Sequence, residues 1–113
     1  DTGIPVIIVT MLGARSGKVR KIGLMRVEHE GEYALVASKG GAPENPGWYA
    51  NVVAHPVVMI QDGPEPHDFT VREVVGAERQ AWWDRSAAVW PAYNDYAENT
   101  DRVIPVLVAT PVS

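Results

Sequence analysis

The sequence is organised around Gly13-Ala14-Arg15-Ser16-Gly17-Lys18-Val19-Arg20-Lys21, a short basic loop between two apolar segments. Five of the ten Lys and Arg residues fall between Arg15 and Arg26, although the chain has a formal net charge of -4. Cations gathered this closely repel one another unless an anion lies among them. The loop therefore predicts an anion-binding site in an otherwise acidic protein.

The composition predicts one soluble domain covering residues 1–113. The chain has 113 residues, of which 46% are hydrophobic and 21% charged, and a chain of this length has little room for a second core. No apolar run approaches the roughly 18 residues that would cross a bilayer. Cysteine is absent, which fits a reducing, cytoplasmic compartment. The three histidines show no ligand spacing, so no metal is expected.

The start of the chain bears on its location. Asp1 stands where an initiator methionine is usual, and the sequence enters a predicted strand almost at once. We therefore expect an N-terminal segment to be missing, and contact with a membrane only through that segment. The expected location is cytoplasmic, or peripheral to the membrane, and the expected state is a monomer or a homodimer.

Alternation of apolar residues predicts strands over residues 4–12, 22–29, 33–37, 57–61, 67–74 and 103–110. The first three are expected to follow one another as antiparallel neighbours, with a turn at Glu30-Gly31. Asn45 as N-cap and Pro46 at the first helical position predict a short helix that ends at His55. A longer helix is expected over 77–90 and a short one over 93–99. About six strands without β-α-β alternation predict a mainly β fold, an antiparallel barrel with two or three short helices across it.

The basic loop is not a P-loop. That motif needs four residues between its glycines and a Ser or Thr after the lysine, whereas Gly13 and Gly17 enclose three and Val19 follows Lys18. What remains is a loop whose cations and backbone N–H groups could hold a phosphate or several carboxylates. A solvated hairpin turn is the alternative.

A second loop, Ser38-Lys39-Gly40-Gly41, places a hydroxyl, an ammonium group and unencumbered backbone at the end of a predicted strand. Ligands often bind at such a barrel mouth. Trp82 and Trp83 are interpreted as core residues. Tyr93 and Tyr96 lie among polar residues, where a tyrosine tends to expose its hydroxyl.

No nucleophile with an adjacent base is apparent, so a hydrolase has no support in the sequence. An anion-binding loop beside an aromatic mouth is typical of a protein that takes its chemistry from a cofactor. Three alternatives stay open: a flavin mononucleotide reductase, a non-enzymatic binder of a polyanionic cofactor, and a nucleic-acid module. The last is disfavoured by the negative total charge and by the confinement of the cations to one stretch.

Five segments occur in order along nearly the whole chain: TMLGARSGK at 10–18, ASKGGA at 37–42, NPGWYAN at 45–51, Trp90-Pro91 with Tyr93 and Tyr96, and TDR at 100–102 before IPV at 104–106. In this combination the sequence resembles the deazaflavin-dependent nitroreductase family, in the class A branch of the split β-barrel flavin- and deazaflavin-dependent oxidoreductases. The resemblance implies a split β-barrel and the coenzyme F420, whose tail carries a phosphate and an oligo-γ-glutamate. It also implies hydride transfer from the reduced deazaflavin to a small electron-poor acceptor such as a quinone, an activated enone or a nitroaromatic.

The resemblance also implies roles for individual residues. The tail of the coenzyme would meet Ala14, Arg15 and Ser16, and the coenzyme would run along Arg20, Lys21, Ile22, Gly23, Leu24 and Met25. The deazaflavin ring would be bordered by Val36, Ala37, Ser38 and Lys39, with the pocket completed by Gly47, Trp48, Tyr49, Ala50 and Asn51. Tyr93 would donate a proton to the acceptor or orient it, with Ser38 and Tyr96 sharing the role.

Two positions depart from the family members that reduce nitroimidazole prodrugs. Met25 and Trp90 stand where those members carry tyrosines. The departure argues against prodrug reduction and leaves coenzyme binding intact.

Overall fold

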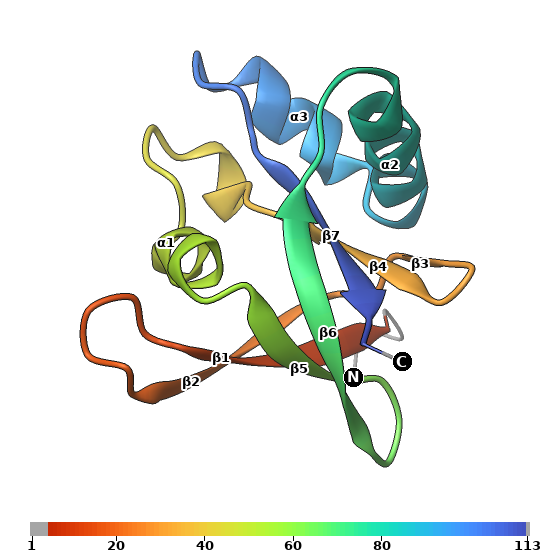
Figure 1. The fold of residues 1–113 in the computed structure, drawn as a ribbon. Coiled ribbons are helices and arrows are strands. Elements are labelled where there is room, and N and C mark those ends of the chain that lie inside the picture. The colour runs from red at the N-terminus through yellow and green to blue at the C-terminus, as the bar shows by residue number, and fades with distance from the viewer. Residues whose placement is uncertain (1–4, 113) are drawn as a thin grey trace.

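The computed structural model describes residues 5–112. Its strands are β1 (Val6–Leu12), β2 (Val19–Met25), β3 (Glu28–His29), β4 (Glu32–Val36), β5 (Val57–Gln61), β6 (Pro66–Glu73) and β7 (Val106–Pro111). Its helices are α1 (Gly47–Ala54), α2 (Gly76–Val89) and α3 (Ala92–Glu98), with a short 3-10 turn, η1 (Lys39–Gly41). The strands form one antiparallel sheet in the order β2-β1-β5-β6-β7-β4-β3, which curls into an open barrel (Figure 1). The predicted mainly β architecture is confirmed.

Two hydrophobic clusters share this sheet. On β1 the side chains of Ile7, Val9 and Met11 are buried while their neighbours are exposed or half-buried, as expected for a strand with one face in the core. On β7, Leu107 belongs to the cluster inside the barrel and Val106 to a second cluster on the opposite face. β7 is therefore covered on both faces, which explains its continuous apolar sequence.

The second cluster lies under α2 and α3, which pack together at one end of the sheet while α1 lies apart from them (Figure 1). Trp82 and Trp83 are 2% and 9% exposed, which confirms their interpretation as core residues. The indole Nε1 of Trp83 donates to Asn94 Oδ1 at 2.9 Å. This bond ties α2 to α3 and so fixes the helix that carries Tyr93 and Tyr96.

The predicted strand over residues 22–29 is wrong in one respect, because the chain breaks there into β2 and β3. β2 begins at Val19 and pairs with β1 over its whole length, whereas β3 pairs with β4. The break occurs where Arg26 N donates to Pro5 O and Val27 O accepts from Ala34 N. The first three predicted strands are therefore not successive neighbours. β2 and β3 lie at opposite edges of the sheet, and their short connection draws these edges together.

A polar cluster stabilises the same connection. Asp62, in the turn between β5 and β6, accepts from Arg26 Nε and from the Tyr33 hydroxyl, both at 2.7 Å on Oδ2. The hydrogen bond from Tyr33 lowers the pKa of Asp62, and Arg26 lowers it further against the opposing effect of burial. Burial and the same carboxylate raise the pKa of Tyr33 to about 12. Three segments distant in sequence are joined here.

Some predicted boundaries need correction. The N-cap of α1 is Pro46 and not Asn45, whose side chain accepts instead from Arg102. The last strand begins at Val106 and not at residue 103, because the carbonyl of Ile104 accepts from Arg79 and that of Pro105 from Ala37 N. The hairpin turn at Glu30-Gly31 is confirmed, with φ values of 52° and 84° as a two-residue turn of this kind requires.

Candidate functional site

A cleft of about 310 Å³ opens between the β2 edge of the sheet, α1 and α3. Its walls combine apolar, aromatic and small residues: Gly23, Leu24, Met25, Val36, Ser38, Lys39, Gly40, Pro46, Trp48, Trp90, Tyr93 and Tyr96. Four separate segments of the chain meet here. The three predicted catalytic residues, Ser38, Tyr93 and Tyr96, lie in this cavity with three of the predicted ring-binding residues, Val36, Lys39 and Trp48. We call the cavity the ring cleft.

Tyr93 lies deeper in the ring cleft than the sequence indicated. The expectation of an exposed tyrosine is wrong, because Tyr93 is only 6% exposed and its ring lies 6.2 Å from those of both Trp83 and Tyr96. Burial, with a smaller effect of Tyr96, raises the pKa of Tyr93 to about 12. Its hydroxyl makes no hydrogen bond to another residue in the described part of the chain. The phenol therefore stays protonated at neutral pH and can donate to a bound molecule.

Trp90 and Tyr96 form a second pair in the cleft. The indole Nε1 of Trp90 donates to the Tyr96 hydroxyl oxygen at 3.4 Å, a long and weak hydrogen bond. In this bond Trp90 is the donor and the Tyr96 oxygen is the acceptor, so the hydroxyl proton of Tyr96 can still be donated to another group.

Ser38 and Lys39 reach the ring cleft from the loop that follows β4. Ser38 is 8% exposed, and the backbone of the next three residues is left-handed, with φ of 45° at Lys39, 63° at Gly40 and 83° at Gly41. Left-handed conformation is costly for a residue with a side chain, so Lys39 must be held in place. Its Nζ pairs with Glu44 Oε1 at 2.7 Å, and this hydrogen bond lowers the pKa of Glu44.

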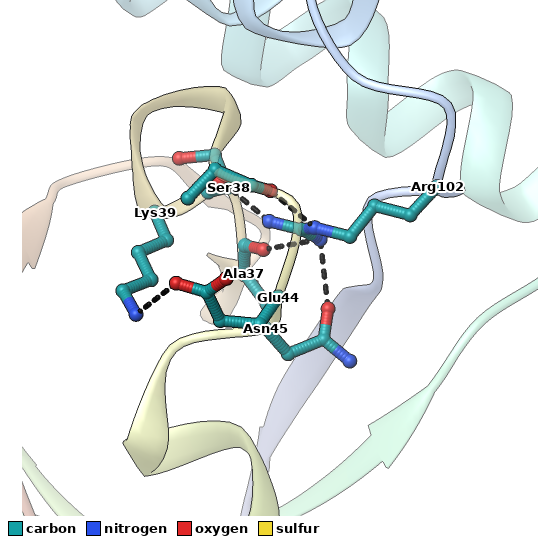
Figure 2. A network of polar contacts seen from close by, with 7 residues as sticks. Ala37, Ser38, Lys39, Glu44, Asn45 and Arg102 are labelled. Carbon is teal, nitrogen blue, oxygen red and sulfur yellow. Dashed lines mark hydrogen bonds and ion pairs between the residues drawn. The ribbon is translucent and has the colours of Figure 1, made fainter.

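Arg102 holds the same loop from the other side (Figure 2). Its guanidinium donates to the carbonyls of Ala37, Ser38 and Ala42 and to Asn45 Oδ1, at 2.7 to 3.1 Å. Sequence reasoning noted Arg102 within a motif and gave it no role. Its partners lie 57 to 65 residues earlier in the chain, and no local pattern reveals such a contact.

A second hollow, of about 350 Å³, lies at the basic loop and is lined by Gly13, Ala14, Arg15, Ser16, Arg20, Ala50 and Asn51. The loop is closed by hydrogen bonds from Gly13 N to Lys18 O and from Gly17 N to Gly13 O. Asn51 on α1 anchors it, because Asn51 Oδ1 accepts from Ala14 N at 2.9 Å. We call this hollow the basic hollow.

The cations of the basic loop, of which Arg15 and Arg20 line the basic hollow, are available to a ligand. Arg15, Lys18, Arg20 and Lys21 are all exposed, and none forms an ion pair with another residue of the range 5–112. By contrast, Arg26, Lys39 and Arg72 each form an ion pair with a carboxylate. The basic hollow could therefore accept a polyanion, which is the kind of ligand that the charge pattern led us to expect.

The two hollows are built on the same two elements. β2 contributes Arg20 to the basic hollow and Gly23 to the ring cleft, three residues or roughly 10 Å further along the strand. α1 contributes Asn51 to the former and Trp48 to the latter. An elongated molecule could thus lie along β2 with an anionic end in one hollow and a planar end in the other.

Some predicted contact residues line neither hollow: Lys21, Ile22, Ala37, Gly47 and Tyr49. Ile22 packs on the cluster inside the barrel and Ala37 is fully buried. The hydroxyl of Tyr49 donates to Glu73. The predicted ranges were continuous, whereas side chains in a strand alternate between its faces. Conversely, Pro46 and Trp90 line the ring cleft and were not predicted as coenzyme contacts.

The model of the F420H(2)-dependent quinone reductase family matches residues 2–111. The chain belongs to this family.

Relatives of known name or structure agree with this family. An F420H(2)-dependent quinone reductase of Mycobacterium tuberculosis is 33% identical over 109 residues, covering 94% of this chain and 73% of the relative. The solved structure of an F420-H2 dependent reductase (FDR-A) is 49% identical, with a TM-score of 0.88 over 93% of each chain. A second solved structure, described as a domain-swapped dimer, is also 49% identical, with a TM-score of 0.88 over 93% of this chain and 79% of that one.

Membership of the F420H(2)-dependent quinone reductase family confirms several predictions made from the sequence. The protein is an oxidoreductase that uses coenzyme F420, and its fold is the split barrel of FDR-A. The flavin mononucleotide reductase and the non-enzymatic binder are not favoured. Within residues 5–112 no group of His, Cys, Asp and Glu could hold a metal ion. No described helix is both long and apolar enough to cross a membrane.

Proposed function

We propose that the protein binds reduced coenzyme F420 along β2, with its anionic tail at the basic hollow and its deazaflavin ring in the ring cleft, and reduces a quinone there. The proposal is carried by two features on the same strand and helix: cations without an ion-pair partner among residues 5–112, and an aromatic cleft. When bound, the coenzyme supplies a hydride. The protein supplies position, a dry site and a proton.

The residues of the ring cleft suit these tasks. Val36, Leu24 and Trp48 offer apolar surface to a planar ring, while Ser38 is nearly buried beside them. Reduction of a quinone carbonyl places negative charge on its oxygen, and a phenol within hydrogen-bond reach can stabilise that charge or donate a proton. Tyr93, protonated at neutral pH, is the proposed donor. Ser38 and Tyr96 are its proposed neighbours at the acceptor.

Met25 and Trp90 favour a quinone over a nitroimidazole as acceptor. Both line the ring cleft, and together they present a thioether and an indole where the nitroimidazole-reducing members resembled by the sequence carry two phenols. An apolar, planar acceptor matches such a wall better than a polar one.

The test is to mix the protein with reduced F420 and menadione and to follow the return of the oxidised deazaflavin absorbance. We expect turnover well above the rate in buffer, and slower turnover with nitroimidazoles than with menadione. No acceleration across a set of quinones and enones would exclude the proposed reaction. Equilibrium dialysis against F420 and flavin mononucleotide then shows whether the coenzyme is bound at all.

We predict that Arg15→Ala weakens F420 binding by about tenfold, on the order of 1 kcal/mol, because the exposed guanidinium makes a charge-assisted contact with the tail. The loss should shrink as salt rises, since the contact is partly open to solvent. Fluorescence titration at low and high salt measures both effects. The matched control is Arg85→Ala, because Arg85 stacks on Trp82 at 4.7 Å, far from the basic loop in sequence and structure. Equal affinities for F420 and for its tail-less deazaflavin core would contradict the assignment.

We also propose the homodimer among the two predicted oligomeric states. A relative 49% identical to this chain is described as a domain-swapped dimer. The outer face of β1 and β5 exposes Val6, Leu12, Val57 and Met59, each at least 40% accessible, which is an unusual apolar surface for a single chain. Sedimentation equilibrium should give twice the mass of one chain, and Met59→Lys should lower it. A monomer at all concentrations would rule the homodimer out.

A further inference from the structure

Arg102 is nearly saturated by the loop that it holds (Figure 2). An arginine side chain has five N–H donors, and four of them are used here, on Ala42 O, Ala37 O, Asn45 Oδ1 and Ser38 O. The guanidinium therefore has little capacity left for a ligand. The positive charge of Arg102 is stabilised by the carbonyl dipoles of the loop, and its hydrogen bonds stabilise the loop in return.

The loop needs such a partner because Lys39 is left-handed although it carries a side chain, whereas Gly40 and Gly41 adopt this conformation readily. Three consecutive residues, Lys39 to Gly41, are left-handed. Within residues 38–42 the turn is closed by backbone hydrogen bonds from Gly41 N to Ser38 O and from Ala42 N to Lys39 O. Arg102 adds contacts to the residues immediately before and after the left-handed stretch. A single planar group with a fixed fork geometry can bridge these carbonyls at once, and a lysine ammonium cannot.

The loop also abuts α3. A Cβ atom built on Gly41 would lie 3.0 Å from the backbone oxygen of Tyr96, so the loop and the helix are in direct backbone contact there. The position of Ser38 and Lys39 is thus linked to that of Tyr96, and Arg102 lies just after α3 on the chain. One guanidinium therefore fixes two walls of the ring cleft relative to each other.

We infer that Arg102 is a positioning residue, which holds Ser38 and Lys39 in place at the ring cleft without touching the coenzyme. The inference rests on the proposed coenzyme site. Because the carbonyls of Ala37 and Ser38 accept from Arg102, loss of the guanidinium should displace the ring-side loop and leave the basic hollow unchanged. This separates Arg102 from Arg15, which acts on the tail.

The experiment compares Arg102→Lys with wild type in fluorescence titrations against two probes, F420 and its tail-less deazaflavin core. We expect Arg102→Lys to lower the affinity for both probes by the same factor, roughly tenfold, because both contain the deazaflavin ring. The weakening should not depend on salt. The matched control is Arg72→Lys, since Arg72 pairs with Glu78 through two hydrogen bonds on β6 and α2 and lines neither hollow. It should bind both probes as wild type does.

The outcomes are distinct. Binding of both probes by Arg102→Lys within twofold of wild type overturns the inference, and so does a loss confined to F420, because Arg102 would then act on the tail. If wild type binds neither probe, the proposed coenzyme site fails and the inference with it. Should Arg102→Lys unfold, Asn45→Ala removes one of the four acceptors and leaves the other three. It is expected to weaken both probes equally by about twofold to threefold, and selective weakening of F420 or no change counts against the inference.

Discussion

Replacing Tyr93 by phenylalanine is expected to lower turnover with enones and quinones about a hundredfold, a typical contribution of a positioned proton donor. The substitution keeps the ring that packs between Trp83 and Tyr96 and removes only the hydroxyl. Coenzyme affinity and thermal stability should therefore change little. The loss should be larger for enones, which must be protonated, than for acceptors that tolerate an anionic product. Steady-state kinetics with several acceptors, together with coenzyme titration, measures the effect.

The pH dependence of the wild-type enzyme provides a second check on Tyr93. Because burial raises its pKa to about 12, the phenol keeps its proton between pH 7 and pH 10. Ionisation of Tyr93 should therefore cause no fall in turnover over that range. The control for Tyr93→Phe is Tyr33→Phe. This variant removes a hydroxyl that donates to Asp62 outside the ring cleft, and it should retain turnover. If Tyr93→Phe matches wild type on every acceptor, Tyr93 only packs α3 against the barrel.

Replacing Asp62 by alanine is expected to lower the free energy of unfolding by about 2 kcal/mol at neutral pH, because Arg26 and Tyr33 both lose their acceptor. In a domain of this size that corresponds to a fall in Tm of about 10 °C. The contribution arises from closure of the barrel and not from the ring cleft. Turnover below the melting range should therefore be retained. Thermal unfolding followed by circular dichroism measures the change.

The sign of the pH dependence follows from the lowered pKa of Asp62. Its unfolded pKa is about 3.9, so the stabilisation is complete above that pH and is lost as the pH falls through the lower, folded-state pKa. The difference between wild type and Asp62→Ala should accordingly be largest near neutral pH and shrink in acid. Asp68→Asn is the control, because Asp68 is exposed on β6 and forms no ion pair within the described residues. A difference that persists unchanged in acid would contradict the role given to Asp62.

The sequence predicted what is local and missed what is long-range. Strand periodicity and turn chemistry located β1, β5 and β6 within a few residues, because apolar alternation and glycine turns are encoded by neighbouring positions. The break after Met25 was not predictable in this way. Val27 is apolar and extends the pattern, yet its side chain is buried in the cluster beneath α2 and not inside the barrel. Only the pairing of β3 with β4 reveals the change.

The candidate site shows the same division. The cations of the basic loop stand together in the sequence, so the proposed anion site could be predicted from charge alone. The depth of Tyr93 was not, because the polar residues around it face solvent on α3 while the tyrosine faces Trp83. Arg102 was equally hidden. Its acceptors are mostly backbone carbonyls, which every residue type provides, so the identities of its partners carry no signal.

The place of the ring cleft in the sheet has a consequence for amide hydrogen exchange. One wall includes Val36 on β4, a strand that pairs with β7 up to Val36 and with β3 only at its start. The other wall is β2, which pairs on one side only within the described residues. Amides of β4 and β7 should exchange only through global unfolding, whereas those on the outer edge of β2 should exchange through local opening. A ligand that spans both walls must restrain the edge strand. Coenzyme binding should therefore slow exchange most at residues 20–25 and scarcely at all in β7, which mass spectrometry can resolve by peptide.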